Sequence, residues 1–290
     1  MVKRIITGIC GILVAVAIIT GGGFFFSGAV LFLAAVGWYE YHKMAASQGY
    51  HVYPLSSGGG TLLVVLMAGL GYYVEMEPVF ILAFMLMLSV IFFVFIAIEG
   101  LYRHCNWQEA NWSGDTALSA WGMFYCGLLF AHVIVLRAFD GGPHINLGFR
   151  VFEYGEVCLW IVLLGTWASD TVAYFFGTFF GKTPFCSVSP KKSFEGAVAG
   201  FVGCFVAVLF MCTRWLNTPL AQSVVLAFAV AVFAPLGDLV ESVIKRSFDI
   251  KDSGKLFPGH GGVLDRFDSL LFTAPMIYYL LMLTGVFFGY

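Results

Sequence analysis

Charge is what this chain has least of. Only 11% of its 290 residues are charged, while 60% are hydrophobic, and a typical soluble domain carries about 25% charged residues. The shortage excludes an ordinary soluble domain and predicts an all-α protein that crosses a membrane many times. The net charge of −2 offers no bulk attraction to a polyanion, so nucleic acid is not an expected partner.

The chain also lacks cysteine spacing typical of a metal or redox site. Its seven cysteines include no Cys-x-x-Cys pair and lie mostly in apolar runs, so we expect them to be small packing residues. No small-residue cleavage site follows the first apolar run, which favours a first membrane helix over a signal peptide. Internal repeats and low-complexity tracts are missing as well, and no loop is long enough to be a soluble domain.

Nine apolar runs approach or exceed the length of a membrane-spanning helix, which is ~20 residues. They cover residues 5–20, 24–42, 61–73, 78–98, 117–138, 153–181, 194–213, 220–244 and 268–290. The sequence therefore predicts about nine transmembrane helices. About five belong to an N-terminal region, residues 1–150, and the others to a C-terminal region, residues 151–290.

Glycines mark two further features. Gly58–Gly60 predicts a turn before the short third span. Two pairs at small-xxx-small spacing predict close helix packing instead, Gly177 with Gly181 and Gly196 with Gly200.

Basic residues are distributed unevenly between the two sides of the predicted spans. When the ends and loops are numbered alternately, twelve of the fifteen Lys and Arg residues fall on one side, and only Arg137, Arg150 and Arg214 fall on the other. Because basic residues collect on the cytoplasmic side, the N-terminus is predicted to be cytoplasmic and the C-terminus outside. Loops 182–193 and 245–267 are then cytoplasmic.

Most of the polar chemistry lies in one window, residues 242–268. These 27 residues hold nine of the chain's 32 charged residues, together with Pro258 and four glycines. Carboxylates bind divalent cations, and cations with flexible backbone bind phosphates. The window therefore predicts metal-assisted phosphate chemistry, because a plain solvated loop would not require the run Gly-His-Gly-Gly before Asp265.

Ionisable side chains inside spans cost ~2.5–3.5 kcal/mol on insertion scales and are usually functional. Asp170 lies well inside the sixth span. Asp238, Glu241, Ser242 and Lys245 recur at i, i+3, i+4 and i+7 and so share one face of the eighth. A simple ion pair with Lys245 also explains Glu241, and a helix-helix hydrogen bond also explains Asp170.

Three acids form the predicted metal site. Asp265 and Asp268 share a helix face if the ninth span begins there, and Asp238 supplies a third carboxylate. Such oxygen ligands suit Mg²⁺.

Lys191, Lys192 and Ser193 stand just before the seventh span. Free N–H groups, the helix dipole and two ammonium groups favour an anion there, and ordinary positive-inside anchoring is the alternative. Because this stretch and the 242–268 window are both predicted to be cytoplasmic, they can share one ligand.

The order of residues in the window resembles the signature of phosphatidate cytidylyltransferases, also called CDP-diacylglycerol synthases. It runs Ser242, Lys245-Arg246, four residues, Lys251-Asp252, then Pro258-Gly259-His260-Gly261-Gly262, two residues, and Asp265-Arg266-Phe267-Asp268. The segment 191–196 and the helix around Asp170 also look like family segments, and the family has a similar number of spans.

This resemblance implies an integral-membrane nucleotidyltransferase of phospholipid biosynthesis, which makes CDP-diacylglycerol and pyrophosphate from CTP and phosphatidate. It implies Mg²⁺, with K⁺ as a second metal, bound through Asp238, Asp265 and Asp268. The implied protein is a homodimer among the lipids of the inner (plasma) membrane, with its active site facing the cytoplasm.

Each polar residue of these segments then takes an expected role. The expected catalytic residues are Asp238, Lys245, Arg246, Asp252, Asp265, Arg266 and Asp268. The expected substrate-binding residues are Asp170, Lys191, Lys192, Ser193, Ser242, Lys251, Gly259, His260, Gly261 and Gly262. Because two polyanions must meet, positioning and charge neutralisation would do most of the catalysis.

Two other functions remain open. A cytidylyltransferase for another lipid phosphate needs the same triphosphate site. A transporter typically binds its substrate near the bilayer midplane and often shows inverted repeats. Here the charge gathers at one membrane face, and Asp170 is the only deep acid in favour of transport.

Overall fold

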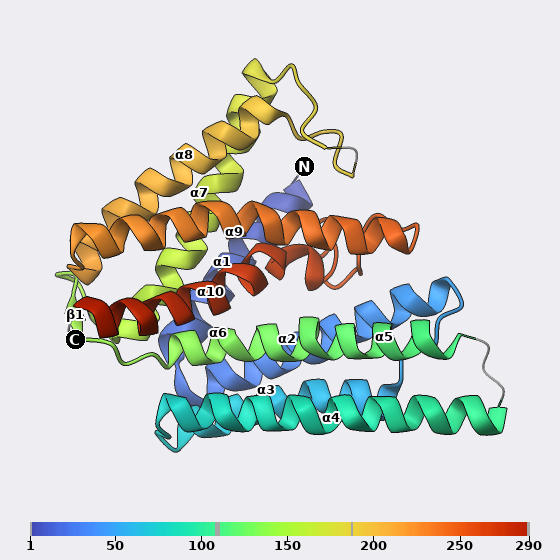
Figure 1. Ribbon diagram of the computed structural model, residues 1–290. Helices are drawn as coiled ribbons and strands as arrows, with labels where there is room; N and C mark the ends of the chain where they lie inside the picture. The colour runs from blue at the N-terminus through green and yellow to red at the C-terminus, as the bar shows by residue number, and fades with distance from the viewer. Residues whose placement is uncertain (1, 108–110, 187, 289–290) are drawn as a thin grey trace. The chain divides into compact units, whose positions relative to one another are not determined.

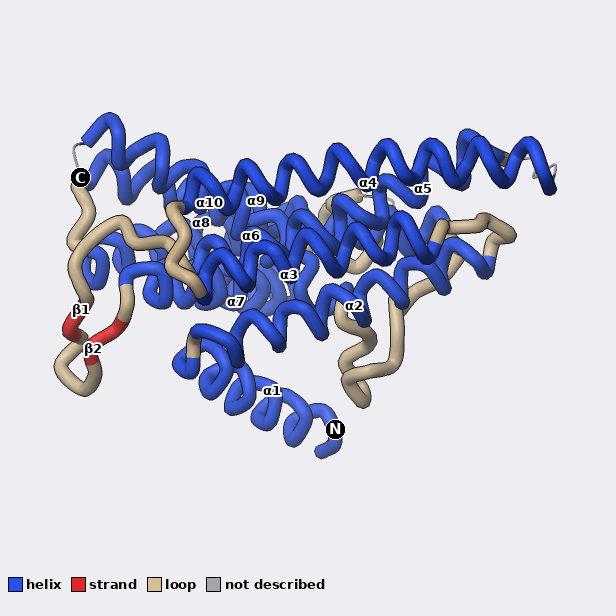
Figure 2. Tube along the Cα trace, turned by 90° about the horizontal axis from the view of Figure 1, so that it is seen from below, coloured by secondary structure: helices blue, strands red, loops and turns tan. Residues whose placement is uncertain are grey.

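The computed structural model describes residues 2–107, 111–186 and 188–288, and most of these are helical (Figures 1 and 2). The elements are α1 (Val2–Gly21), α2 (Gly23–Ser47), η1 (Pro54–Gly58), α3 (Gly59–Tyr73), α4 (Pro78–Trp107), α5 (Trp112–Met123), η2 (Phe124–Leu128), α6 (Leu129–Arg137), β1 (Ile145–Asn146), β2 (Val151–Phe152), α7 (Tyr154–Phe180), α8 (Phe194–Met211), η3 (Cys212–Leu216), α9 (Leu220–Ser247) and α10 (Leu264–Phe288). Each η element is a π-helical turn that continues a neighbouring α-helix, and β1 pairs with β2 in a short antiparallel hairpin.

Eight helices within the described part of the chain are long and apolar enough to cross a membrane. A shorter apolar helix, Thr7–Gly21, precedes them. In lipid every backbone polar group must be satisfied internally, and a helix achieves this within one segment. The prediction of an all-α polytopic membrane protein is therefore confirmed, while its orientation stays a prediction.

The third span differs from its prediction. It runs without a break over Pro54–Tyr73, so the turn predicted at Gly58–Gly60 is wrong. A Cβ on Gly60 would lie 2.7 Å from the sulfur of Met123, and one on Gly58 would lie 3.1 Å from the ring of Trp38. These glycines allow neighbouring helices to approach closely and do not end a helix.

The chain divides into two compact units. Unit 1 consists of Met1–Val135 and Ser247–Arg266, and unit 2 of Leu136–Arg246 and Phe267–Tyr290. Most of the charged loop thus belongs to the same unit as the N-terminal helices.

Buried polar contacts tie the segment after α2 to α5 in unit 1. Asp115 is 1% exposed, and its Oδ1 accepts a hydrogen bond from the backbone N–H of His51 at 2.9 Å. The N–H of Tyr53 donates to the hydroxyl of Ser119, also at 2.9 Å. Because buried backbone groups need partners, these side chains fix the path of the chain into η1.

In unit 2, α7 and α8 pack side by side along much of their length (Figure 1). A Cβ on Gly196 would lie 2.8 Å from the carbonyl oxygen of Ala173, and one on Gly200 equally close to that of Ser169. Only glycine permits such a backbone approach. The predicted close packing through small residues is confirmed.

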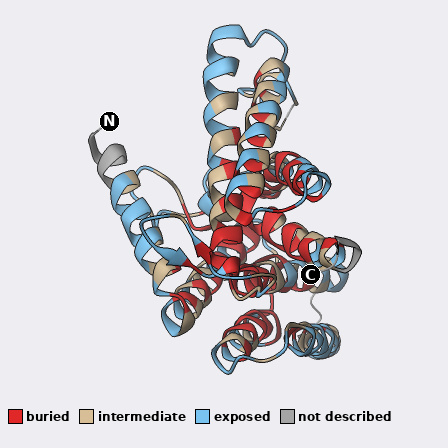
Figure 3. Cartoon of the chain, turned by 90° about the vertical axis from the view of Figure 1, so that its left-hand side faces the viewer, coloured by how far each residue is buried: buried red, intermediate tan, exposed pale blue. Residues whose placement is uncertain are grey.

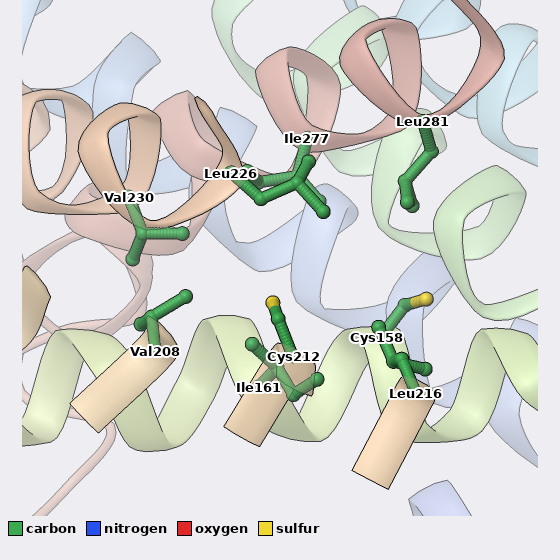
Figure 4. Close-up of a pocket in the computed structure, with 9 residues that line it drawn as sticks. All are labelled: Cys158, Ile161, Val208, Cys212, Leu216, Leu226, Val230, Ile277 and Leu281. Atoms are coloured by element: carbon green, nitrogen blue, oxygen red, sulfur yellow. The ribbon is translucent and has the colours of Figure 1, made fainter. Parts of the chain in front are cut away.

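The core of unit 2 holds a small apolar cavity of about 10 Å³, into which side chains from its helices point (Figure 4). It is lined by Cys158, Ile161, Val208, Cys212, Leu216, Leu226, Val230, Ile277 and Leu281. A space of this size with no polar lining stays dry, so it is part of a packed core. The two cysteines here are buried and free, as expected for packing residues.

Buried residues lie on the helix faces turned toward other helices, and exposed residues on the outer faces (Figure 3). Many of the exposed side chains are large and apolar. On α4, for example, Leu86, Val90 and Phe95 are each about half exposed or more. Outer faces of this kind match lipid contact.

A cluster of ion pairs closes the connection between α6 and α7 in unit 2. The side chain of Arg137 is 1% exposed and pairs with Glu153 and with the equally buried Glu156. Arg150 donates to Glu156 at 3.2 Å and lies over the ring of Phe152, 4.8 Å from its centroid. Buried charges are tolerated only when paired in this way.

Candidate functional site

One acid of unit 2, Asp268, interacts through its charge with acids on two other helices of that unit. Asp170 lies on α7, Asp238 on α9 and Asp268 on α10. Asp268 interacts electrostatically with both other acids and with Lys245. Like charges held near one another are costly unless a cation offsets them, so this group is a candidate site for cations or for a ligand that carries them.

A close contact between α9 and α10 brings Asp238 and Asp268 together. A Cβ on Gly237 would collide with the backbone carbonyl oxygen of Asp268 and would lie 3.0 Å from the Cα of Ser269. Glycine at this position therefore sets the spacing of the two helices where both acids are attached.

Lys192 connects the loop before α8 to this group, because its ammonium forms an ion pair with Asp238. The two side chains are 37% and 27% exposed, so solvent reaches the pair. Lys192 thus meets the eighth span within unit 2, while a ligand shared with the 242–268 window stays a prediction. Lys191, which precedes Lys192 in the sequence, is exposed.

The loop that carries Lys192 is held by its own hydrogen bonds. Ser193 caps α8 by accepting from the N–H of Gly196. The carboxylate of Glu195 accepts from the backbone N–H groups of Lys182 and Thr183 and from the Thr183 hydroxyl. Ser193 therefore serves as the N-cap of α8, and Glu195 stabilises the loop.

The remaining polar residues at the end of α9 are arranged along the helix. Lys245 forms an ion pair with Glu241, one turn earlier, which is the simpler of the two explanations that the sequence left open for Glu241. Ser242 is half-buried, and Arg246 is exposed.

No set of three or more His, Cys, Asp or Glu side chains in the described ranges is arranged to ligate a metal ion, so the Mg²⁺ site stays a prediction.

In unit 1 the charged loop folds around Asp265. One oxygen of this carboxylate, Oδ2, accepts from the N–H of Ser253 at 2.8 Å, from its hydroxyl at 2.9 Å and from the N–H of Gly262 at 2.8 Å. Gly259 and Gly261 have φ angles of 77° and 89°, which strain other residues. A Cβ on Gly261 would also lie 2.5 Å from Asp265 Oδ2.

Sequence reasoning missed Glu40 on α2. This residue is only 5% exposed, and its carboxylate accepts from the N–H groups of Val263 and Leu264 and from the hydroxyl of Ser253. The signal was present, since Glu40 is an acid inside the apolar run 24–42. The reasoning that singled out Asp170 applies to it equally.

The other predicted residues of the loop lie in unit 1 with little burial. Lys251, Asp252 and Arg266 are exposed, and His260 is half-buried. A Cβ on Gly8 of α1 would lie 3.9 Å from the Nε2 atom of His260. The roles expected for Lys251, Asp252, His260 and Arg266 stay predictions.

Comparison with known proteins gives a match over most of the chain. The model of a family described as "Cytidylyltransferase family" matches residues 2–284. A phosphatidate cytidylyltransferase of Synechocystis is 32% identical over 297 residues, which cover 97% of this chain and 96% of that protein.

Two chloroplast proteins of Arabidopsis thaliana are also similar. Phosphatidate cytidylyltransferase 4 is 33% identical over 95% of this chain and 72% of its own length. Phosphatidate cytidylyltransferase 5 is 41% identical over 57% of this chain, and the match spans 44% of that protein.

The fold and the charged groups define a multi-pass, all-α membrane protein in which acids from three helices interact with one another or with lysines in one unit. The chain belongs to the cytidylyltransferase family. The resemblance predicted from the 242–268 window, and with it a transferase of lipid biosynthesis, is confirmed.

Proposed function

We propose that this chain transfers the cytidylyl group of CTP to phosphatidate and so makes CDP-diacylglycerol and pyrophosphate. The observation that carries the proposal is the group of Asp170, Asp238 and Asp268 with Lys192 and Lys245 in unit 2, in a chain of this family. Relatives that match nearly its whole length are named phosphatidate cytidylyltransferase.

The chemistry needs little more than positioning and charge. A phosphate oxygen of phosphatidate attacks the α-phosphorus of CTP, and the bond from that phosphorus to the oxygen bridging to the β-phosphate breaks. Pyrophosphate leaves with the bridging oxygen. Because the attacking phosphate is already ionised near neutral pH, a strong general base is not required, and the protein's task is to hold two polyanions together.

Mg²⁺ is the cofactor that we propose, with K⁺ as a second metal. Carboxylate oxygens are the ligands that Mg²⁺ prefers, and Asp238 already holds a cation, the ammonium of Lys192. Asp238 and Asp268 of unit 2 would hold the metal, and a role for Asp265 as a ligand stays a prediction from the sequence. When bound, Mg²⁺ neutralises phosphate oxygens and stabilises the leaving pyrophosphate.

The basic side chains would neutralise the triphosphate and the lipid phosphate. Lys192 is held beside the acids by its ion pair with Asp238, so its ammonium would neutralise a phosphate bound there. The exposed cations Lys191, Arg246, Lys251 and Arg266 would contribute further positive charge. We also propose a homodimer in the inner (plasma) membrane, surrounded by lipid, with its site on the cytoplasmic side where CTP is available.

The function is tested with purified protein in detergent, radiolabelled phosphatidate, CTP and Mg²⁺. We expect the label to move into CDP-diacylglycerol on thin-layer chromatography, and EDTA to stop the conversion. Faster conversion of another lipid phosphate would support the alternative acceptor. No CDP-lipid from any lipid phosphate would overturn the enzyme proposal and leave transport as the alternative.

Replacing Gly237 by alanine should reduce turnover at least about 10-fold, because the added Cβ pushes α9 away from the backbone of Asp268 and displacements of ~1 Å at a site can cost ~100-fold. Overpacking should also destabilise the protein by ~1–3 kcal/mol. Turnover and thermal unfolding measured on one preparation check both effects. The matched control is Gly11→Ala on α1, where a Cβ meets nothing within 4 Å. Wild-type turnover in Gly237→Ala would contradict the role of this contact.

A cysteine in place of the exposed Lys255 should react with a membrane-impermeant thiol reagent from the cytoplasmic side only, since the basic residues place this loop there. The background should have the exposed Cys10 and Cys105 replaced by serine. Arg214→Cys is the matched control and should react only from outside. Labelling of position 255 from outside would contradict the predicted orientation.

A further inference from the structure

Glu40 is a buried acid whose carboxylate accepts three hydrogen bonds from the charged loop of unit 1. Its Oε1 accepts from the N–H of Val263 at 3.0 Å, and its Oε2 accepts from the N–H of Leu264 at 3.1 Å and from the Ser253 hydroxyl at 2.9 Å. Burying a carboxylate is costly unless hydrogen bonds replace its water. Three such bonds, to residues more than 200 positions away, make Glu40 a fixed point for the loop.

Two of these donors belong to the start of α10. The first N–H groups of a helix have no partner within it, and a negative charge there is stabilised by the helix dipole. Leu264 is the first residue of α10, and Val263 precedes it. Glu40 therefore caps α10 from another helix, α2, and sets where the residues just after Leu264 stand.

The loop is also built around this carboxylate. A Cβ on Gly254 or on Gly262 would collide with the carboxylate oxygens of Glu40. These two positions of the window therefore need glycine because a larger residue would leave no room for the Glu40 carboxylate.

Ser253 joins Glu40 to Asp265. Its hydroxyl oxygen lies 2.9 Å from Oε2 of Glu40 and 2.9 Å from Oδ2 of Asp265. A serine hydroxyl has one proton to donate, so the two carboxyl groups share this one donor. A change at Glu40 moves Ser253, and Ser253 also holds Asp265 through its backbone N–H.

We propose that Glu40 is a positioning residue for cytidylyl transfer, which presents Asp265 by fixing the start of α10 and Ser253 together. The proposal rests on the proposed function, because Asp265 is one of the expected catalytic and metal-binding residues. It also means that a helix outside the charged window contributes to the reaction.

The first test compares Glu40→Gln with Glu40→Asp. Glutamine keeps the size but places an NH₂ group among donors, so we expect kcat to fall about 10-fold or more while the KM for CTP changes less than about 3-fold. Aspartate keeps the charge on a shorter side chain and should restore part of the lost kcat. A merely structural role predicts less folded protein with unchanged kcat in both variants, and that result would overturn the proposal.

The second test is amide hydrogen exchange of peptides covering 250–266. If Glu40 positions the loop, Glu40→Gln should speed exchange at Ser253 and Gly262, whose amides donate to Asp265, as well as at Val263 and Leu264. Faster exchange confined to the amides of Val263 and Leu264 would show that Glu40 only caps α10, and it would overturn the proposal.

The matched control is Asp115→Asn. Asp115 is another buried acid of unit 1 that accepts a backbone N–H, but its donor is His51, which lies outside the charged loop. We expect it to lower stability and leave kcat and exchange at Ser253 and Gly262 unchanged. If wild-type protein makes no CDP-lipid, the proposed function fails, while the exchange comparison still decides whether Glu40 holds the partners of Asp265.

Discussion

Replacing Asp268 by asparagine should lower kcat by about 100-fold or more and leave the protein at least as stable as the wild type. Asp268 interacts with the charges of Asp238 and Asp170, and removing one of three like charges relieves repulsion. Losing a charge aimed at phosphate or metal typically costs ~100-fold or more in rate. Local structure should survive, since an asparagine oxygen can still accept from the N–H of Ser269 at 2.6 Å.

Turnover at several Mg²⁺ concentrations, with thermal unfolding of the same preparations, checks this prediction. The control is Asp249→Asn, an exposed acid in the window whose φ of 54° suits asparagine, and it should keep wild-type turnover. An Asp268→Asn variant with more than about half of wild-type kcat would contradict the role of Asp268. Asp265→Asn is a less selective test, because Asp265 also accepts three hydrogen bonds that shape its loop.

Replacing Arg137 by alanine should give the largest loss of stability, about 3–5 kcal/mol in the free energy of unfolding. The change removes a buried guanidinium and leaves Glu156, whose side chain is 1% exposed, with fewer partners. It also opens a cavity beside Glu153 and Glu156 at the start of α7.

Thermal or denaturant unfolding in detergent measures the effect. Arg214→Ala is the matched control, because Arg214 is exposed and surface substitutions usually stay within about 0.5 kcal/mol. If Arg137→Ala unfolds at the same temperature or denaturant concentration as the control, the ion-pair cluster does not stabilise the α6–α7 connection.

The fold class followed from composition, since long apolar runs have few solutions other than helices in a membrane. The error at Gly58–Gly60 has a physical cause. Glycine signals a turn locally, but here Met123 and Trp38 press against it from other helices. Contacts of that kind decide between a turn and close packing, and they are not visible in a local stretch of sequence.

The residues of the candidate site also separate into those that local sequence predicts and those that only distant contacts reveal. Helical spacing placed Asp238 and Lys245 on one face of α9, because i, i+3 and i+7 relations need only local geometry. Glu40 was missed because its partners lie 213 to 224 residues away. The acid itself was visible in an apolar run, but only the folded chain shows what it holds.

The glycines of the window illustrate the same limit. They were expected to let backbone N–H groups approach a phosphate. In the structure the amide of Gly262 donates to Asp265, and Glu40 fills the space beside it. Glycine can serve a ligand or an internal side chain, and a sequence pattern does not distinguish the two.

Following separately labelled phosphates of CTP tests the central claim most directly. Purified protein is given phosphatidate, Mg²⁺ and CTP labelled on either the α- or the γ-phosphate. We predict that the α label enters the lipid fraction and that the γ label leaves as pyrophosphate in equal amount, with both lost in Asp268→Asn. Transfer of the γ label to lipid, or no transfer of the α label by the wild type, would contradict cytidylyl transfer.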